Sequence, residues 1–426
     1  MKESGIDWIG QIPQEWEVIK FKYLGDVKQG LTYSPSDIVD KDEGILVLRS
    51  GNIQNGVLDF TNNVYVKTKV AESIVLRKND ILITARNGSS ALIGKNAIID
   101  TDIKATFGAF MMVFRTNKSL IAKFAFYLMN ISFNFYRTFF TTSTVNQLTA
   151  AIFNGIEVPL PSISEQQKIA DFLDKKTAQL DKVKSLLEEQ IQKLKDYRSS
   201  LIYETVTKGL DKTVPLKDSG IDWIGQVPQG WGVKAIKYIF AEIGSGSTPK
   251  SDNEIFYDGD INWIQSGDLY QTDTVTSVSK TISYQGFKST SALKIYQPPF
   301  VALAMYGASV GNVAVSYIDA CVNQAVVVML GASEKVRFGK YAIEVSKNNL
   351  IFSAQGGTQP NISQNLIKNW SIPQPKSEEQ VQIVDFLDKK TVQIDKLIQI
   401  KNEQIKNINK QQQTLIYDYV TGKRRV

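Results

Sequence analysis

The octet SGIDWIGQ occupies residues 4–11, and the same eight letters return at residues 219–226. Each copy carries a tryptophan, Trp8 or Trp223, and each is followed by an apolar residue and then Pro-Gln. A string of this length and composition does not recur by chance. The chain therefore contains an internal repeat with an offset of 215 residues.

The repeat extends through the whole chain. DFLDKKT at residues 171–177 returns at 385–391, and LIY at 201–203 returns at 415–417. Weaker likeness joins LVLRSGNI (46–53) to NWIQSGDL (262–269), and STVNQLTAAIFNGIEVPLP (143–161) to GTQPNISQNLIKNWSIPQP (357–375). The order is module, long helix, module, long helix, with a shared framework and different surface letters in the two modules.

The repeat predicts an α+β chain with approximate two-fold internal symmetry. We expect a first module at residues 1–160, a first helix at 161–209, a second module at 210–374 and a second helix at 375–426. Short apolar runs such as GILVLRS, DILITA, AFMMVFR, FVALAM and AVVVML predict strands in mixed α/β modules. SLIAKFAFYLMNIS and its counterpart FGKYAIEVSKNN predict one helix in each module.

The first long helix carries a leucine every seven residues, and the second repeats this spacing with leucine or isoleucine except at Lys401. Ser164 and Ser377 each begin a string with the spacing of a capping box, so each is expected to cap a helix, with Gln167 or Gln380 reaching back to the N–H of the cap. Five heptads with one narrow apolar seam are typical of a coiled coil, here antiparallel between the two helices. Packing of each helix on its own module is the alternative. The expected seam residues are Leu173, Leu180, Leu187, Leu194 and Leu201 in the first helix, and Leu387, Ile394, Leu397, Ile408 and Leu415 in the second. Ile169, Val183 and Tyr197 are expected to share the companion row of the seam, three residues after the heptad positions, as Leu397 does.

Composition narrows the possible functions. The chain has 426 residues, no histidine and one cysteine, Cys321. Histidine-based catalysis and histidine- or cysteine-clustered metal sites are thereby excluded. The single cysteine fits a reducing cytosol, and the start of the chain has no apolar segment typical of a signal peptide. The formal net charge of +6 is compatible with a polyanionic partner.

Two unlike modules on a rigid scaffold suit a split DNA site. About 40 helical residues span roughly 60 Å at ~1.5 Å per residue. That length corresponds to about two turns of B-DNA at ~34 Å each. We therefore expect each module to read a different short sequence, with the helices setting the distance between them.

The repeated motifs resemble those of type I restriction–modification specificity subunits. The resemblance rests on the octet with PQEWEVIKFKYL, on GSTPKSDNEIFYDGDINWIQSGDL, and on GGTQPNISQNLIKNWSIPQP followed by SEEQVQIVDFLDKKTVQID. It covers nearly the whole chain. It implies two target recognition domains separated by two conserved helices. The first half departs from the motif, with QGLTYSP in place of SGSTP, so we expect different loop geometry there.

The resemblance also implies an activity and partners. Such a subunit recognises double-stranded DNA, has no catalytic role, and binds modification subunits that methylate adenine. Restriction subunits join to form an ATP-dependent nuclease. It implies that this chain binds no cofactor, with S-adenosylmethionine, ATP and magnesium on the partner subunits, and that the complex acts in the cytoplasm without a membrane.

Two strings imitate catalytic motifs. FAEIGSG (240–246) and QPPF (297–300) look like methyltransferase loops, but Gln297 replaces the residue expected to accept from a flipped adenine. GSSALIGKN (88–96) looks like a phosphate loop, but Asn96 stands where Ser or Thr would bind magnesium. Neither string supports catalysis.

The candidate DNA contacts are polar residues at expected strand ends. Arginine pairs with guanine and Asn or Gln with adenine, whereas lysine more often grips phosphate. Any one of these residues can equally be a solvated loop residue. The candidates are Arg49, Asn52, Arg86, Asn87 and Lys95 in the first module, and Lys250, Gln265, Asp268, Tyr306, Asn312, Gln359 and Asn361 in the second.

Two alternatives stay open from the sequence. Trp8 and Trp223 are expected to anchor each module to the scaffold, or else to form part of the surface offered to modification subunits. Further apolar helix positions, among them Ile191, Ile398 and Ile405, widen the stripe for module packing or partner binding. A coiled-coil scaffold that binds only proteins, without DNA affinity, is the competing function.

Overall fold

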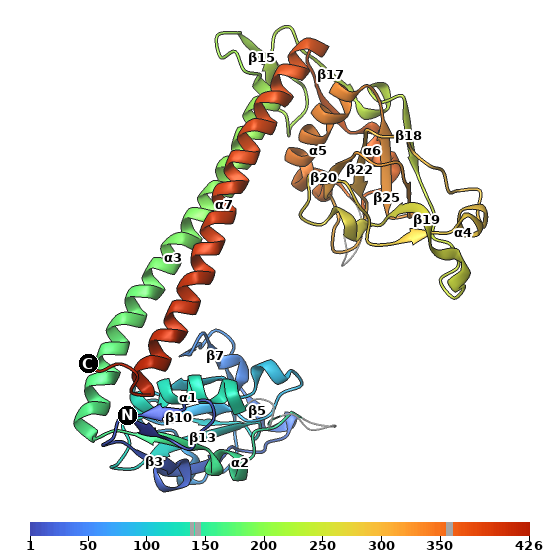
Figure 1. The fold of residues 1–426 in the computed structure, drawn as a ribbon. Helices are drawn as coiled ribbons and strands as arrows, with labels where there is room; N and C mark the ends of the chain where they lie inside the picture. Colours follow the sequence, from blue (N-terminus) through green and yellow to red (C-terminus); the bar gives the residue numbers. More distant parts are fainter. Residues whose placement is uncertain (137–139, 141–145, 355–360) are drawn as a thin grey trace. The chain divides into compact units, whose positions relative to one another are not determined.

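The computed structural model describes residues 1–136, 140, 146–354 and 361–426. It forms two compact units: residues 1–187 with 402–426, and residues 188–401. Both long helices cross this division. Each unit therefore combines one module with the start of one long helix and the end of the other (Figure 1).

The first module contains two four-stranded sheets with the orders β11-β10-β13-β4 and β12-β6-β9-β5. Only β12 and β6 pair in parallel; the other neighbours in these sheets are antiparallel. The strands of the first unit are β1 (Lys2–Glu3), β2 (Gln11–Ile12), β3 (Glu17–Lys20), β4 (Gly25–Gln29), β5 (Ile38–Val39), β6 (Ile45–Leu48), β7 (Ile53–Gln54), β8 (Val57–Leu58), β9 (Val64–Val66), β10 (Ile81–Thr84), β11 (Asn96–Ile98), β12 (Ala105–Phe107), β13 (Met111–Thr116) and β14 (Glu157–Leu160).

The second module has a five-stranded sheet, β18-β25-β22-β23-β20, and a three-stranded sheet, β21-β19-β24. Parallel pairs again occur at sheet margins, β20 with β23 and β24 with β19. The strands of the second unit are β15 (Leu216–Asp218), β16 (Gln226–Pro228), β17 (Gly232–Ala235), β18 (Glu242–Ser245), β19 (Tyr257–Ile264), β20 (Thr274–Val275), β21 (Thr281–Ile282), β22 (Phe300–Ala304), β23 (Val313–Ser316), β24 (Cys321–Val322), β25 (Val326–Leu330) and β26 (Ser371–Gln374).

One helix packs against the main sheet of each module, as expected from the sequence (Figure 1). The strands beneath these helices are apolar on both faces because each sheet is covered on both sides. The helices are α1 (Ala122–Tyr136), α2 (Ala150–Gly155), α3 (Ile163–Lys208), α4 (Tyr284–Lys288), α5 (Ser333–Ser353), α6 (Gln364–Asn369) and α7 (Ser377–Val420). Within the described residues, no helix combines the length and apolar content needed to cross a membrane.

The helix starts differ from the expected caps. Helix α3 begins before Ser164, and its capping hydroxyl is that of Ser162, which accepts from the Glu165 N–H at 3.3 Å. Ser377 is the first residue inside α7. The buried Gln166 and Gln380 fasten the helix starts to the preceding strands, because their amides donate to the carbonyls of residues 161 and 375 at 3.0 and 2.9 Å.

The long helices run antiparallel within each unit. In the first unit, the ring of Phe172 lies 4.5 Å from that of Tyr419, and Asp181 accepts from Gln412 at 3.5 Å. In the second unit, Lys401 donates to Gln190 at 2.6 Å. In each unit, moving forward along one helix means moving backward along the other.

The second row of contacts along the seam between the long helices lies at other positions than the sequence predicts. Of the expected seam residues, Val183, Tyr197 and Leu397 are 46%, 56% and 47% exposed, so their assignment to the seam is wrong. The half-buried positions lie four residues after each heptad position rather than three, and they include Ile398 and Ile405. Other positions of this row are occupied by polar residues, namely Lys184, Arg198 and Gln412. The apolar pattern of the sequence therefore does not indicate this row. The remaining expected seam residues are buried or half-buried.

Each tryptophan of the octets lies against aromatic rings of its own unit. Trp8 stacks on Phe135 with ring centroids 5.0 Å apart. Trp223 stacks on Trp370 at 6.2 Å and donates to the Ser371 carbonyl at 3.1 Å. The octet is thus a joint between a module and its neighbouring elements.

Candidate nucleic-acid interface

The turn after β6 is held by Asn52. Its side-chain oxygen accepts from the Arg49 N–H at 2.9 Å, and its amide nitrogen donates to the Asp59 carbonyl at 2.9 Å. Asn52 is 1% exposed. Its hydrogen-bonding groups are engaged inside the protein, so the prediction that Asn52 contacts a base is wrong; Asn52 shapes the turn.

Ser50 is the meeting point of three loops in the first module. Asn87 donates to the Ser50 hydroxyl at 3.3 Å, and Lys95 donates to the Ser50 carbonyl at 3.4 Å. The half-buried Arg49 precedes it and donates to the Asn62 carbonyl at 3.4 Å. The structure therefore brings Arg49, Asn87 and Lys95 together although up to 46 residues separate them in the chain.

Arg86 adds an aromatic element that the sequence did not reveal. Its guanidinium lies 5.5 Å from the ring centroid of Phe110, which is 61% exposed. The Phe110 carbonyl also accepts from the Arg86 N–H at 3.0 Å. A cation above an exposed ring suits contact with phosphates or with an unstacked base. The available signal was an aromatic residue in the turn between β12 and β13, outside the strand alternation.

Asp268 repeats the role of Asn52 in the second module. Its two carboxylate oxygens accept from the backbone N–H groups of Gln265 and Ser279 at 2.8 and 3.0 Å. With both oxygens engaged, it forms the turn, and its predicted DNA contact is not favoured by this geometry. The half-buried Gln265 lies at the start of that turn.

Tyr306 and Asn361 come together from distant parts of the chain. The Ile362 N–H donates to the Met305 carbonyl at 2.8 Å, and this pairing places the exposed Asn361 beside the half-buried Tyr306. The first module has the same pairing between Leu148 and Ala85, also at 2.8 Å. Gln359 lies outside the described residues.

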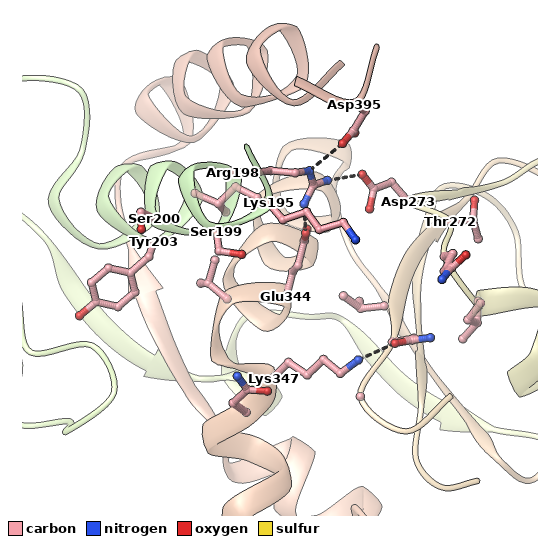
Figure 2. A pocket seen from close by; sticks show the side chains of 18 of the residues that line it. Lys195, Arg198, Ser199, Ser200, Tyr203, Thr272, Asp273, Glu344, Lys347 and Asp395 are labelled. Carbon is pink, nitrogen blue, oxygen red and sulfur yellow. Dashed lines mark hydrogen bonds and ion pairs between the residues drawn. The ribbon is translucent and has the colours of Figure 1, made fainter. Parts of the chain in front are cut away.

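The remaining two candidates are in different surroundings. Asn312 accepts from Lys347 of α5 at 2.6 Å and lines a cavity of about 1190 Å³ (Figure 2). Burial lowers the pKa of Lys347, with Glu344 opposing the shift. Lys250 is exposed in the loop after β18, where the Tyr257 hydroxyl donates to the Pro249 carbonyl at 2.7 Å.

The strings that imitate methyltransferase motifs have structural roles. A Cβ on Gly246 would lie 1.8 Å from the Val322 carbonyl oxygen, and one on Gly244 would lie 2.2 Å from the Tyr296 hydroxyl. These glycines permit close packing of chain segments. Phe300 is fully buried in the core and is therefore not available to grip a base.

The assembled loops present cations and amides in the first module, and amides with a tyrosine in the second. Such groups can bind phosphate oxygens and read base edges in the major groove. The two edges differ in charge and in side-chain type.

Comparison with known proteins gives the family. The profile described as "Type I restriction modification DNA specificity domain" matches residues 13–195 and 228–410. The StySPI specificity subunit of Salmonella potsdam is 30% identical over 219 residues, which cover 50% of this chain and 47% of that protein. The EcoKI specificity subunit of Escherichia coli is 31% identical over 198 residues, covering 45% of this chain and 43% of that protein. The match thus spans under half the length of these two relatives.

Other relatives align over nearly their whole length. The MjaVIII specificity subunit of Methanocaldococcus jannaschii is 25% identical over 440 residues, covering 98% of this chain and 94% of that protein. A solved type I restriction–modification system contains a chain with TM-score 0.74 and 17% identity, covering 97% of this chain and 100% of that one. The HsdS subunit of Thermoanaerobacter tengcongensis gives TM-score 0.51 and 17% identity, with 97% and 98% covered. Because the family profile matches both repeats, this chain belongs to the type I restriction–modification DNA specificity family.

Proposed function

We propose that this chain reads a bipartite, asymmetric DNA site for a type I restriction–modification complex and performs no catalysis itself. Each module reads one half of the site. The helices set the number of base pairs between the halves. The observation that carries this proposal is that the same contacts fasten each module to the long helices, while the loop residues offered to DNA differ between the two modules. We call these two sets of loop residues the reading edges.

The joints are alike in detail. The Tyr127 hydroxyl donates to Asp174 at 2.8 Å, and the Tyr341 hydroxyl donates to Asp388 at 2.6 Å. The same correspondence holds for the indoles of Trp16 and Trp231, which donate to Glu165 and Glu379 at 3.0 and 2.8 Å. A framework kept constant beneath variable loops is the arrangement expected of interchangeable readers.

Partner subunits supply the chemistry in this proposal. Modification subunits bind S-adenosylmethionine and methylate adenine, and restriction subunits use ATP and magnesium, in the cytoplasm. The residues described here serve to bind DNA and to hold the readers. They bind none of these cofactors.

We propose that the modification subunits dock on apolar pairs that recur in both helices. Val183 and Leu186 of α3 are 46% and 48% exposed, and the matched Leu397 and Ile400 of α7 are 47% and 42% exposed. Half-exposed apolar side chains at i and i+3 on a helix suit a partner helix. Each repeat has one such pair, and each pair binds one modification subunit.

The test is methylome sequencing of cells that express this chain with its modification subunit. A split adenine motif is the expected result. Exchange of residues 26–150 for the equivalent segment of another family member should then change one half of the motif only. A change in both halves or in neither contradicts the modular function. Absence of DNA affinity, together with tight binding to other proteins, would favour the scaffold function.

A further inference from the structure

Five charged side chains meet where the second module touches the long helices. Arg198 of α3 lies 2.6 Å from Asp273 in the loop before β20 and 3.3 Å from Asp395 of α7, and it also pairs with Glu344 of α5 (Figure 2). Lys340 of α5 lies 2.8 Å from Asp273 and 2.7 Å from Glu344. One arginine therefore joins both long helices to two elements of the module. We name this set of five residues the Arg198 network.

The two cations of the network are largely removed from water, whereas the Asp273 and Asp395 side chains are 44% and 51% exposed. The side chains of Arg198 and Lys340 are 15% and 4% exposed. Burial opposes the charge on Arg198, but Glu344, Asp273 and Asp395 outweigh burial, and the pKa of Arg198 is raised. Ion pairs at a protected site are screened by salt less than surface pairs are. Rotation of the module relative to α3 would draw Asp273 and Glu344 away from the buried Arg198, which disfavours other angles.

The first unit has no equivalent at the matched positions, which lie 214 residues away. Gln412 and Asp181 correspond to Arg198 and Asp395, and they are joined by one hydrogen bond of 3.5 Å. Phe126 and Asn130 stand where α5 has Lys340 and Glu344. The neighbouring joint, by contrast, is identical in both units, since Tyr127 and Tyr341 keep the same partners. The network is therefore an addition to one half of a duplicated framework.

We infer that Arg198 is a positioning residue for DNA recognition: its network fixes the angle at which the second module is carried on the long helices. This inference rests on the proposed function for its consequence at DNA, where the angle sets the accepted spacer length and the alignment of the second reading edge. Apolar contacts tolerate small rotations, whereas three carboxylates around one guanidinium do not. At the matched place the first unit has Phe126, Asn130 and a hydrogen bond from Gln412 to Asp181 between the long helices.

The angle can be measured without DNA. Spin labels on Glu188→Cys of α3 and Tyr284→Cys of the second module report it by pulsed electron–electron distance measurement on the full chain. The native Cys321 is fully buried, and burial raises its pKa to about 12, so it should stay unlabelled. Asp395→Asn and Arg198→Gln should broaden the distance distribution at least twofold. Asp181→Asn, the matched change in the other unit, and Lys193→Gln, an exposed charge on the same helix, should leave it unchanged.

DNA binding gives the second readout. For the complex with its modification subunits, Arg198→Gln should reduce the preference for the correct spacer over spacers one base pair longer or shorter by about tenfold. Selectivity at the half-site read by the first module should stay constant, and Arg198→Lys should restore part of the loss. Folded variants with unchanged distance distributions would overturn the inference, and so would a uniform loss of affinity without loss of spacer preference. Absence of sequence-selective binding by the unsubstituted complex would overturn the proposed function, while the distance measurement still decides the role of Arg198 in holding the module.

Discussion

The hydroxyl of Tyr417 donates to the backbone carbonyl of Trp8 at 3.1 Å. The last turns of α7 are thereby fastened to the first octet, 409 residues earlier in the chain. Tyr203 makes a similar bond at 3.1 Å to the carbonyl of Ile224, one residue further along the octet, which fastens the end of α3 to the second octet. Each octet therefore receives the end of a long helix as well as its own module. The tryptophan-bearing string occurs twice because each unit needs this joint.

The buried tyrosine joint should be worth more than an exposed tyrosine. Tyr341→Phe leaves Asp388 without the hydroxyl that donates to it at 2.6 Å. We expect a loss of about 1–3 kcal/mol in the free energy of unfolding, because a partly buried carboxylate loses a partner. Tyr238→Phe, at a side chain 72% exposed, is the control and should change stability by less than about 0.5 kcal/mol. Urea unfolding followed by far-UV circular dichroism measures both, and equal midpoints would contradict the joint.

Lengthening both helices by one heptad should lengthen the spacer. Seven residues inserted between residues 188 and 189 of α3, and seven between residues 401 and 402 of α7, add about 10 Å. At ~3.4 Å per base pair this corresponds to about three base pairs. A heptad keeps the seam on the same helix face, whereas insertion in one helix alone breaks the pairing. Methylome sequencing should show both half-sites unchanged and three more base pairs between them; an unchanged spacer would reject the ruler.

Two cation substitutions should have different consequences for DNA binding. Arg86→Ala should cost about 1–3 kcal/mol and relax selectivity in one half-site, because arginine reads guanine bidentately. Lys250→Ala should weaken binding about equally for all sequences and reduce the salt dependence by about one counterion. Fluorescence anisotropy with half-site variants, at several salt concentrations, separates the two. Identical profiles for both variants would show that the assignment of these roles is wrong.

The exposed apolar pairs should be required for partner binding and dispensable for folding. Val183→Asp with Leu186→Asp should abolish binding of one modification subunit, and the matched Leu397→Asp with Ile400→Asp should abolish the other. The four side chains are 42–48% exposed, so the unfolding midpoint should change little. Ile38→Asp, at a module side chain 49% exposed, is the control for a new surface charge. Sedimentation of the purified complex gives the stoichiometry, and two bound subunits on each double variant would exclude this surface.

Stability should fall steeply in alkali. Burial raises the pKa of Cys321 from 9.0 to about 12 and that of Tyr296 from 10.0 to about 12. The unfolded chain therefore releases these protons first, so the stabilisation is complete below about pH 8 and is lost from about pH 9 to pH 12. At pH 10 the cysteine alone accounts for a loss on the order of 1 kcal/mol. Cys321→Ala should flatten the fall in urea midpoint between pH 8 and 10, and an unchanged slope would contradict the raised pKa.

The helix seam shows what periodicity can and cannot reveal. Leucines at seven-residue spacing predicted the long helices and one row of the seam correctly in position. The companion row could lie three or four residues further on, and the apolar residues Val183, Tyr197 and Leu397 favoured the first choice. All three are exposed in the structure, at 46%, 56% and 47%. Polar residues fill much of the true row, and pattern alone cannot distinguish them from surface residues.

The reading edges show a similar division. Arg49, Asn87 and Lys95 were recognised as polar residues at strand ends, but only the sheet pairing brings them around Ser50. Asn52 and Asp268 are also polar residues at strand ends, yet their side chains are hydrogen-bonded within the turns that they form. The sequence does not predict the contact of Phe110 with Arg86 or the Arg198 network, because the partners come from distant segments of the chain. Distance in space between such segments has no local signal.

The sequence by itself determined the duplication, the order of modules and helices, the family, and the apolar strands and helices, because these depend on local periodicity and on repeated strings. Only the tertiary structure decided which polar side chains are hydrogen-bonded within turns and which remain available to a partner or a duplex. It also decided which five charged residues form the Arg198 network. Burial and hydrogen-bond saturation depend on what lies opposite a residue, and the neighbour opposite is set by the packing of segments hundreds of residues apart.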